Sequence, residues 1–305
     1  MYQQFSENLQ NGFKHEKNGV EAEIDTPDYD DALTAANSIR IKLELTQNPE
    51  VAIVCGSGLG GLAEEIQEAK AIPYDQIPGF PKPTVKGHKG KLVFGVLSGK
   101  YVVCMQGRIH PYEGYSLAKC AFPIRVMRLL GAKTVILTNA AGGLNTSFKC
   151  GDLMVIKDQI FFPGLAGRSP LVGRNDERLG QRFPSLNNMY DKELRDIAHK
   201  CSEKHGVKFQ EGVLCMVGGP QFETPAENRM LKMMGGDAVG MSVAHEAVVA
   251  RHCGFKVFGM SLITNISELD SNGEQAVGLH DEVLAEGKKA SQRCATVVKE
   301  ILNEI

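Results

Sequence analysis

The stretch Val51-Ala-Ile-Val-Cys-Gly-Ser-Gly-Leu-Gly-Gly61 decides the class of fold. Its first five residues form a short apolar run that ends at a glycine, which is typical of a buried strand. Further apolar runs of this kind lie at 92–97, 101–105, 134–138, 152–156, 213–217 and 257–263. Stretches with the apolar spacing of a helix lie at 29–39, 59–70, 117–130, 190–205, 225–234, 244–253 and 280–301. Strands that alternate with helices predict an α/β fold, in which helices flank a mixed, largely parallel central sheet.

The chain divides into a short extension and one domain. Residues 1–28 are polar and lack periodicity, so we expect a loosely ordered N-terminal extension there. No linker rich in Pro, Gly or Ser and no internal repeat interrupts 29–305, which predicts a single domain. A long stretch without clear periodicity covers 161–188, and loops of that length tend to be functional or to make subunit contacts.

Composition excludes several classes of partner. The chain has 34 Lys and Arg against 36 Asp and Glu, a formal net charge of −2, whereas binding to nucleic acid or to an anionic membrane usually needs a basic excess. Its eight Cys are widely separated and form no CxxC pair, which predicts reduced, buried thiols and no metal site. Neither a secretory signal nor an apolar run of membrane-spanning length is visible, so we expect a soluble cytoplasmic protein.

The glycine loop 56–61 matches the pattern GxGxxG and is open to more than one interpretation. Glycines let the backbone approach an anion, and the N-terminus of the helix expected at 59–70 would add free N–H groups. A dinucleotide site also needs an acidic residue about 20 residues further on, at the end of the next strand. Asp75 stands there between prolines, and no strand is evident before it. The loop therefore predicts a phosphate-sized anion site that includes Ser57, or a tight turn without a ligand.

Three side chains that suit an anion follow the strand at 101–105. Arg108, His110 and Tyr112 are spaced two residues apart, so an extended segment would project all three to one side. Arginine offers a planar fork to phosphate oxygens, histidine a switchable donor, and tyrosine a flat face with a hydroxyl. Glu113 could orient the imidazole. The alternative is a surface cluster at a strand end.

Three more segments end an apolar strand or turn in small and polar residues, at 138–143, 217–224 and 261–265. Ligands of open α/β sheets bind beyond the carboxyl ends of the strands, where these segments would gather. The segments at 240–242 and 87–88 would add to them. Together they supply a carboxylate, a carboxamide, hydroxyls and an arginine.

In this order the segments resemble the low-molecular-mass, trimeric purine nucleoside phosphorylases, from about Val51 to Leu284. The matching motifs are Cys-Gly-Ser-Gly-Leu-Gly-Gly (55–61), Gly-His-Lys-Gly (87–90), Gln-Gly-Arg-Ile-His-Pro-Tyr-Glu-Gly-Tyr (106–115), Thr-Asn-Ala-Ala-Gly-Gly (138–143), Gly-Pro-Gln-Phe-Glu-Thr (219–224), Ala-Val-Gly-Met-Ser (238–242) and Ile-Thr-Asn (263–265). The resemblance implies the fold of the nucleoside phosphorylases and a homotrimer.

The resemblance also implies the site residues. Its phosphate site would consist of Ser57, His88, Arg108, His110, the backbone of Ala140, and Ser242. The nucleoside would be bound by Tyr112 and Met241 at the ribose, His280 at the 5′-hydroxyl, Phe222, Glu223 and Asn265 at the purine, and Phe183 from the neighbouring subunit. Asn265, Glu223 and His110 would carry the catalysis.

The implied reaction is phosphorolysis in purine salvage, in which inorganic phosphate cleaves a purine nucleoside into the free base and (deoxy)ribose 1-phosphate. It requires no metal or redox cofactor. Glu223 as an acceptor suits a 6-oxopurine, which carries a proton on N1, and this favours inosine and guanosine.

Two departures from the family pattern leave points open. Ile266-Ser267 stands where vertebrate-like members show Lys-Val, so a shifted preference for methylthioadenosine, adenosine or another nucleoside is the main alternative. Val243 and His245 replace the threonine and proline of Ser-Thr-Val-Pro-Glu, which leaves the phosphate affinity open. A nicotinamide-dependent oxidoreductase and a purine-binding protein without turnover are the rivals from other classes.

Overall fold

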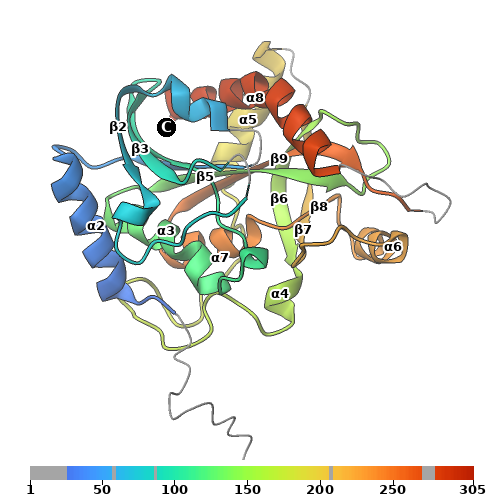
Figure 1. The fold of residues 1–305 in the computed structure, drawn as a ribbon. Helices are drawn as coiled ribbons and strands as arrows, with labels where there is room; N and C mark the ends of the chain where they lie inside the picture. Colours follow the sequence, from blue (N-terminus) through green and yellow to red (C-terminus); the bar gives the residue numbers. More distant parts are fainter. Residues whose placement is uncertain (1–25, 57–59, 86–87, 206–208, 270–278) are drawn as a thin grey trace, which may run out of the picture.

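A computed structural model describes residues 26–56, 60–85, 88–205, 209–269 and 279–305 (Figure 1). Its strands are β1 (Val51–Cys55), β2 (Gln67–Pro73), β3 (Lys91–Leu97), β4 (Lys100–Gln106), β5 (Thr134–Gly143), β6 (Leu153–Phe161), β7 (Phe209–Met216), β8 (Ala238–Gly240) and β9 (Lys256–Ile266). The α-helices are α2 (Tyr29–Leu43), α3 (Leu117–Leu129), α4 (Phe162–Leu165), α5 (Lys192–His205), α6 (Pro225–Met233), α7 (Ala244–His252) and α8 (Leu279–Glu304). Three 3₁₀ helices lie at Gly60–Glu65, Tyr74–Gln76 and Pro111–Glu113.

The strands form one mixed sheet in the order β2-β3-β4-β1-β5-β8-β7-β6-β9. Strand β1 pairs in parallel with both β4 and β5, and β5–β9, β6–β7 and β7–β8 are also parallel. The pairs β2–β3, β3–β4, β5–β8 and β6–β9 are antiparallel. Because β9 also pairs with β5, the strands from β5 to β9 close on themselves. The expected mixed α/β sheet is confirmed.

Helices cover the sheet on two sides, as Figure 1 shows. One layer of buried side chains joins α2, α3 and α7 to the sheet, and a second joins α5 and α8 to it. All five residues of β1 are buried, because a central parallel strand is covered on both faces. No helix in the described part of the chain is both long and apolar enough to cross a membrane.

The prediction of a helix at 59–70 is wrong. A 3₁₀ helix occupies Gly60–Glu65, and the edge strand β2 follows it. The apolar spacing of Leu62 and Ile66 is real, since both side chains are buried, but the glycine pair at its start is a poor helix former. In β2 only Ile72 is buried, which explains why the strand was not recognised.

The expectation that no strand precedes Asp75 is also wrong, because β2 ends at Pro73. This strand is antiparallel to β3 and is separated from β1 by β3 and β4. Asp75 therefore does not follow a strand adjacent to β1, as a dinucleotide site would need.

Several strands extend beyond their apolar runs. Pairing between β5 and β9 continues to Gly143 and Ile266, so 138–143 belongs to a strand instead of following one. The short elements β8 and α4 carry too little pattern to be predicted. Helix α2 begins at the expected Tyr29, where Asp28 and Asp31 form a capping box. Most of the expected extension 1–28 lies outside the described residues.

Candidate active site

A cavity of about 320 Å³ opens where the segment after β4, the ends of β5, β8 and β9, and the segment before α6 meet. The segments that the sequence placed at strand ends do gather here. The lining includes Val85, Arg108, His110, Tyr112, Asn139, Ala140, Ala141, Gly142, Pro220, Phe222, Glu223, Val239, Gly240, Met241, Ser242, Thr264, Asn265, Ser267 and Val283. A cavity at a common edge of the strands is the usual ligand site of such sheets.

A turn after β4 brings Arg108 and His110 to the cavity. Gly107 adopts a φ of +113°, and a Cβ on it would lie 2.9 Å from the backbone nitrogen of Gly90. The hydroxyl of Tyr74 donates to the Gly107 carbonyl at 2.7 Å. Only glycine fits this close approach. The contact with Gly90 and the hydrogen bond from Tyr74 together fix the turn.

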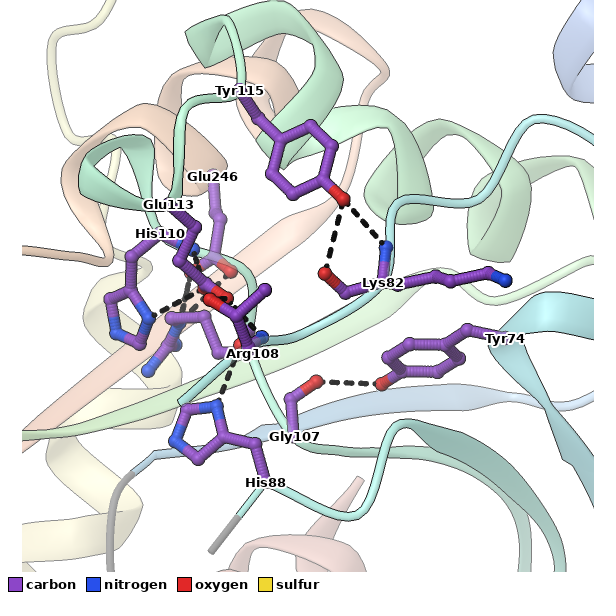
Figure 2. A network of polar contacts seen from close by, with 10 residues as sticks. Tyr74, Lys82, His88, Gly107, Arg108, His110, Glu113, Tyr115 and Glu246 are labelled. Carbon is purple, nitrogen blue, oxygen red and sulfur yellow. Dashed lines mark hydrogen bonds and ion pairs between the residues drawn. The ribbon is translucent and has the colours of Figure 1, made fainter. Parts of the chain in front are cut away.

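Arg108 is held by a buried carboxylate (Figure 2). Its Nε donates to both oxygens of Glu246 at 2.9 and 3.0 Å, its Nη2 lies 2.9 Å from Oε2, and its Nη1 donates to the Thr138 carbonyl at 2.6 Å. The Arg108 and Glu246 side chains are each 1% exposed. A paired fork of this kind fixes the orientation of the guanidinium. Sequence reasoning gave Glu246 no role, because the pair joins residues 138 positions apart.

His110 is oriented by Glu113, as the sequence suggested. The Glu113 Oε1 accepts from the His110 backbone N–H at 2.7 Å and lies 3.4 Å from the ring Nδ1. Burial opposes ionisation of Glu113, but hydrogen bonds from His110 and Thr84 outweigh it and lower its pKa to about 2. Burial lowers the pKa of His110; the hydrogen bond to Glu113 opposes this effect, and the nearby Arg108 adds to it. A neutral imidazole therefore lies beside a fixed carboxylate.

Aromatic contacts complete this wall of the cavity. The His110 ring stacks on Tyr112 with centroids 4.7 Å apart and planes 13° apart, and its centroid lies 5.4 Å from that of His88. Tyr112 stands on a 3₁₀ helix and not on the expected extended segment, yet it lines the cavity together with Arg108 and His110. Arg108, His110 and Tyr112 therefore share one side of the cavity, as expected, although the segment that carries them is not extended.

The glycine loop is anchored to β5. The Gly56 N–H donates to the Thr138 hydroxyl at 3.1 Å, and that hydroxyl donates to the Val54 carbonyl at 3.0 Å. A Cβ on Gly56 would lie 2.6 Å from the Thr138 carbonyl oxygen, so glycine is needed for this approach. Ser57, which the resemblance places in the phosphate site, lies outside the described residues.

Asn139 is a polar lining residue that sequence reasoning did not single out. Its Oδ1 accepts from the buried Ser261 hydroxyl at 2.8 Å, and its Nδ2 donates to the Ala140 carbonyl at 3.1 Å. Asn139 belongs to the motif 138–143, to which the sequence analysis assigned only the backbone of Ala140. Ser242, 5% exposed, lines the same cavity.

Both departures noted next to Ser242 lie at the start of α7. Val243 precedes the helix with a φ of +78°, which is rare for a β-branched residue. His245 is fully buried, and neither ring nitrogen has a hydrogen-bond partner within the described residues. Burial, and then Arg108 and His110, lower its pKa well below the usual range, so the ring is neutral.

The other side of the cavity is more open. Phe222 is 44% exposed and Glu223 is half-buried, and burial raises the pKa of the Glu223 carboxyl. The Asn265 Oδ1 accepts from the Thr264 hydroxyl at 3.2 Å. Ser267 also lines the cavity, and its backbone N–H donates to the Gly143 carbonyl at 2.9 Å. These side chains leave a carboxylate and a carboxamide facing a common space.

The structure brings together nine of the residues expected in the site, which are Arg108, His110, Tyr112, Ala140, Phe222, Glu223, Met241, Ser242 and Asn265. The His88 ring lies next to that of His110, but His88 does not line the cavity. Phe183 is 86% exposed and lies away from this cavity. His280 is the second residue of α8, but its side chain lies outside the described residues. Within the described ranges, no three His, Cys, Asp or Glu side chains are grouped to hold a metal ion.

The fold and this cavity are those of a phosphorylase. In agreement, a family model described as the Phosphorylase superfamily matches residues 50–303. The mouse purine nucleoside phosphorylase is 50% identical over 91% of this chain and 96% of its own length. Purine nucleoside phosphorylase 1 of Bacillus subtilis is 46% identical over 86% of this chain and 94% of its own length. A Schistosoma mansoni purine nucleoside phosphorylase in complex with inosine superposes with a TM-score of 0.86, at 47% identity over 90% of this chain and 96% of the other. This chain belongs to the purine nucleoside phosphorylases.

Proposed function

We propose that this protein cleaves inosine, guanosine and their 2′-deoxy forms with inorganic phosphate, giving the free purine and (deoxy)ribose 1-phosphate. The observation that carries the proposal is one cavity with two unlike groups of residues. The buried group (Arg108, His110 and Ser242) suits an oxyanion, and the open group (Phe222, Glu223 and Asn265) suits a planar base with donors and acceptors at its edge. Schistosoma purine nucleoside phosphorylase structures with inosine and with guanosine, and a purine nucleoside phosphorylase structure with ribose 1-phosphate, support the assignment.

The chemistry follows from the charges that develop. Breaking the glycosidic bond leaves positive charge on the ribose and negative charge on the departing base. Phosphate held by the buried group acts as the nucleophile and offsets the charge of the sugar. Asn265 donates its amide to N7 of the purine as electron density builds there, and Tyr112 and Met241 contact the ribose. His88, Ser57 and the backbone of Ala140 complete the phosphate site. Such a reaction needs no metal or redox cofactor.

Base selectivity rests on Glu223. As a carboxylate it accepts a hydrogen bond from the N1–H of a 6-oxopurine, whereas adenine presents only a lone pair at N1 and would leave the half-buried carboxylate unpaired. A second candidate, a shifted preference for adenosine or methylthioadenosine, is supported by Ser267 in the lining and by a related Schistosoma phosphorylase in complex with adenosine.

We also propose a cytoplasmic homotrimer in which Phe183 reaches the neighbouring subunit's site. Its ring is 86% exposed, on the long segment that follows α4, and so is available to a second subunit. All eight cysteines are free, which suits a reducing compartment. A stable, fully active monomer in a sizing measurement would contradict the role of Phe183.

The test is base release from inosine, guanosine, adenosine and methylthioadenosine, each with and without phosphate. We expect release from the first two, and only with phosphate. Phosphate-independent release or none at all would refute the proposal. Binding of a nicotinamide nucleotide would restore the oxidoreductase interpretation, and preferential release from methylthioadenosine or adenosine would establish the second candidate.

A further inference from the structure

Helix α6 connects two residues of the open group that belong to different segments of the chain. Figure 1 shows the helix at the rim of the molecule, beyond β7 and β8. Only the N-cap Thr224 separates Glu223 from Pro225, the first residue of α6. Asn265 is the next-to-last residue of β9. The spacing between Glu223 and Asn265 therefore depends on how α6 is fastened to the end of β9.

The start of α6 is joined firmly to Glu223. Thr224 and Glu227 form a capping box, in which each side chain accepts a hydrogen bond from the backbone N–H of the other residue. Pro225 stands at the first helical position, where its ring restricts the backbone further. A shift of α6 would therefore move Glu223 with it.

Two consecutive side chains of α6 reach the segment that follows Asn265. Asn228 donates from Nδ2 to the Glu268 carbonyl at 3.0 Å. Arg229 donates from Nη1 to the Leu269 carbonyl at 2.5 Å. Both carbonyls lie beyond the end of β9, where the sheet no longer holds the chain. These bonds fasten the segment after β9 to α6.

Asn228 is an unusual choice for the buried face of this helix. Its side chain is 3% exposed, and its Oδ1 has no hydrogen-bond partner among the described residues. An unpaired buried amide oxygen destabilises the folded state. Leu231, the other buried residue of α6, packs in a small apolar cluster and anchors the helix independently. A buried polar residue that breaks the local pattern in this way is typical of a functional position.

We propose that Asn228, supported by Arg229, is a positioning residue for the purine base, through which α6 sets the spacing between Glu223 and Asn265. The bond to Glu268 closes a ring that runs from Glu223 through α6 to Glu268 and back along the chain to Asn265, and both of its ends line the cavity. Because the link consists of hydrogen bonds at the rim and not of core packing, the base side stays adaptable. The inference rests on the proposed function, since the base is the ligand that the two residues would bind.

Steady-state kinetics with inosine and phosphate test the proposal. Asn228→Leu keeps the branched shape of the side chain and removes the donor. We expect the KM for inosine to rise about fivefold or more, as for the loss of one hydrogen bond, with the KM for phosphate unchanged. Asn228→Ala should give the same result, and Arg229→Gln, at an exposed position, a smaller rise. Met233→Ala, 81% exposed on the same helix, is the control and should change neither KM. Equal changes of both KM values in the Asn228 variants, or no change, would overturn the role of Asn228.

A double-mutant cycle distinguishes positioning from a general loss of structure. Asn265→Ala already lacks one of the two contacts whose spacing Asn228 sets. Adding Asn228→Leu to it should therefore lower kcat/KM for inosine by a much smaller factor than the same change does in the wild type. Equal factors in the two backgrounds would show that Asn228 does not act through Asn265 and would overturn the proposal.

Hydrogen exchange of the full chain, without nucleoside or phosphate, separates this proposal from the proposed function. The Ser267 N–H donates to the Gly143 carbonyl at 2.9 Å and lies between Asn265 and Glu268. Its exchange should be about fivefold or more faster in Asn228→Leu and unchanged in Met233→Ala. If the wild type does not cleave inosine, the proposed function fails, whereas unchanged exchange at Ser267 in Asn228→Leu overturns the link between α6 and the end of β9.

Discussion

The buried and the open group of the catalytic cavity differ in how firmly they are held. Arg108, His110 and Ser242 are 1%, 6% and 5% exposed, whereas Phe222 is 44% exposed. Each side chain of the buried group comes from a segment that packs into the core, and Arg108 and His110 are each bonded to a carboxylate. The comparison indicates that the anion side is preorganised by the fold, while the base side is free to adapt to different substrates.

The largest effect is expected from Glu246→Leu. It leaves the Arg108 guanidinium buried without its counter-charge, which typically costs about 3–5 kcal/mol. Urea unfolding should report this loss. Glu203→Leu, at an exposed position on α5, is the control and should stay within about 0.5 kcal/mol of the wild type. If Glu246→Leu behaves like the control, the buried group is not held by this pair.

The second largest effect is expected from Asn265→Ala, which should lower the catalytic rate and leave the free energy of unfolding nearly unchanged. Losing one preorganised contact to the developing charge costs about 10²–10³ in rate, roughly 2.7–4 kcal/mol. We expect turnover of inosine to fall by this factor while phosphate binding and the urea midpoint change little. Equal losses in turnover and in phosphate binding would contradict the role of Asn265 at the base.

A smaller effect is expected from Glu223→Gln. Because burial raises the pKa of Glu223, the wild type should lose affinity for inosine as the pH falls through that pKa and the carboxylate takes up a proton. The glutamine variant should lack this acidic limb, and its kcat/KM for inosine at neutral pH should be about tenfold lower or more, since a hydrogen bond to a charged group contributes about 1.5–3 kcal/mol. An unchanged pH profile of kcat/KM would remove Glu223 from base binding.

The smallest effect is expected from Thr224→Ala at the start of α6. The Thr224 hydroxyl accepts from the Glu227 N–H at 3.3 Å, and the Glu227 carboxylate accepts from the Thr224 N–H at 2.8 Å. Removing an N-cap of this type costs about 1 kcal/mol. A urea unfolding curve should show this loss, with kcat/KM for inosine reduced more than the phosphate affinity, because α6 follows the open group directly. An equal reduction of both would erase the distinction between the two groups.

The sequence predicted most elements because buried parallel strands and amphipathic helices leave strong patterns. The elements that it missed have weak ones. In β2 a single side chain is buried, and β8 has only three residues. The prediction of a helix at 59–70 failed because Leu62, in a 3₁₀ helix, and Ile66, directly after it, are both buried, and their spacing matches that of an α-helix.

Site residues were predictable where a motif contained them, but their partners were not. Arg108 and Asn265 stand in motifs, whereas the pairing of Arg108 with Glu246 depends on the start of α7 lying next to the turn after β4. A cavity of about 190 Å³ likewise joins Pro27, Arg125 and His252, which lie far apart in the chain and belong to no recognised motif. Long-range packing of this kind leaves no local pattern to recognise.

The most direct test of the central claim is to follow inosine and inorganic phosphate with the enzyme by ³¹P NMR, while hypoxanthine is measured in the same sample. We predict one ribose 1-phosphate for every hypoxanthine released, and no release when phosphate is left out. Hypoxanthine that appears with free ribose and unchanged inorganic phosphate would contradict the account.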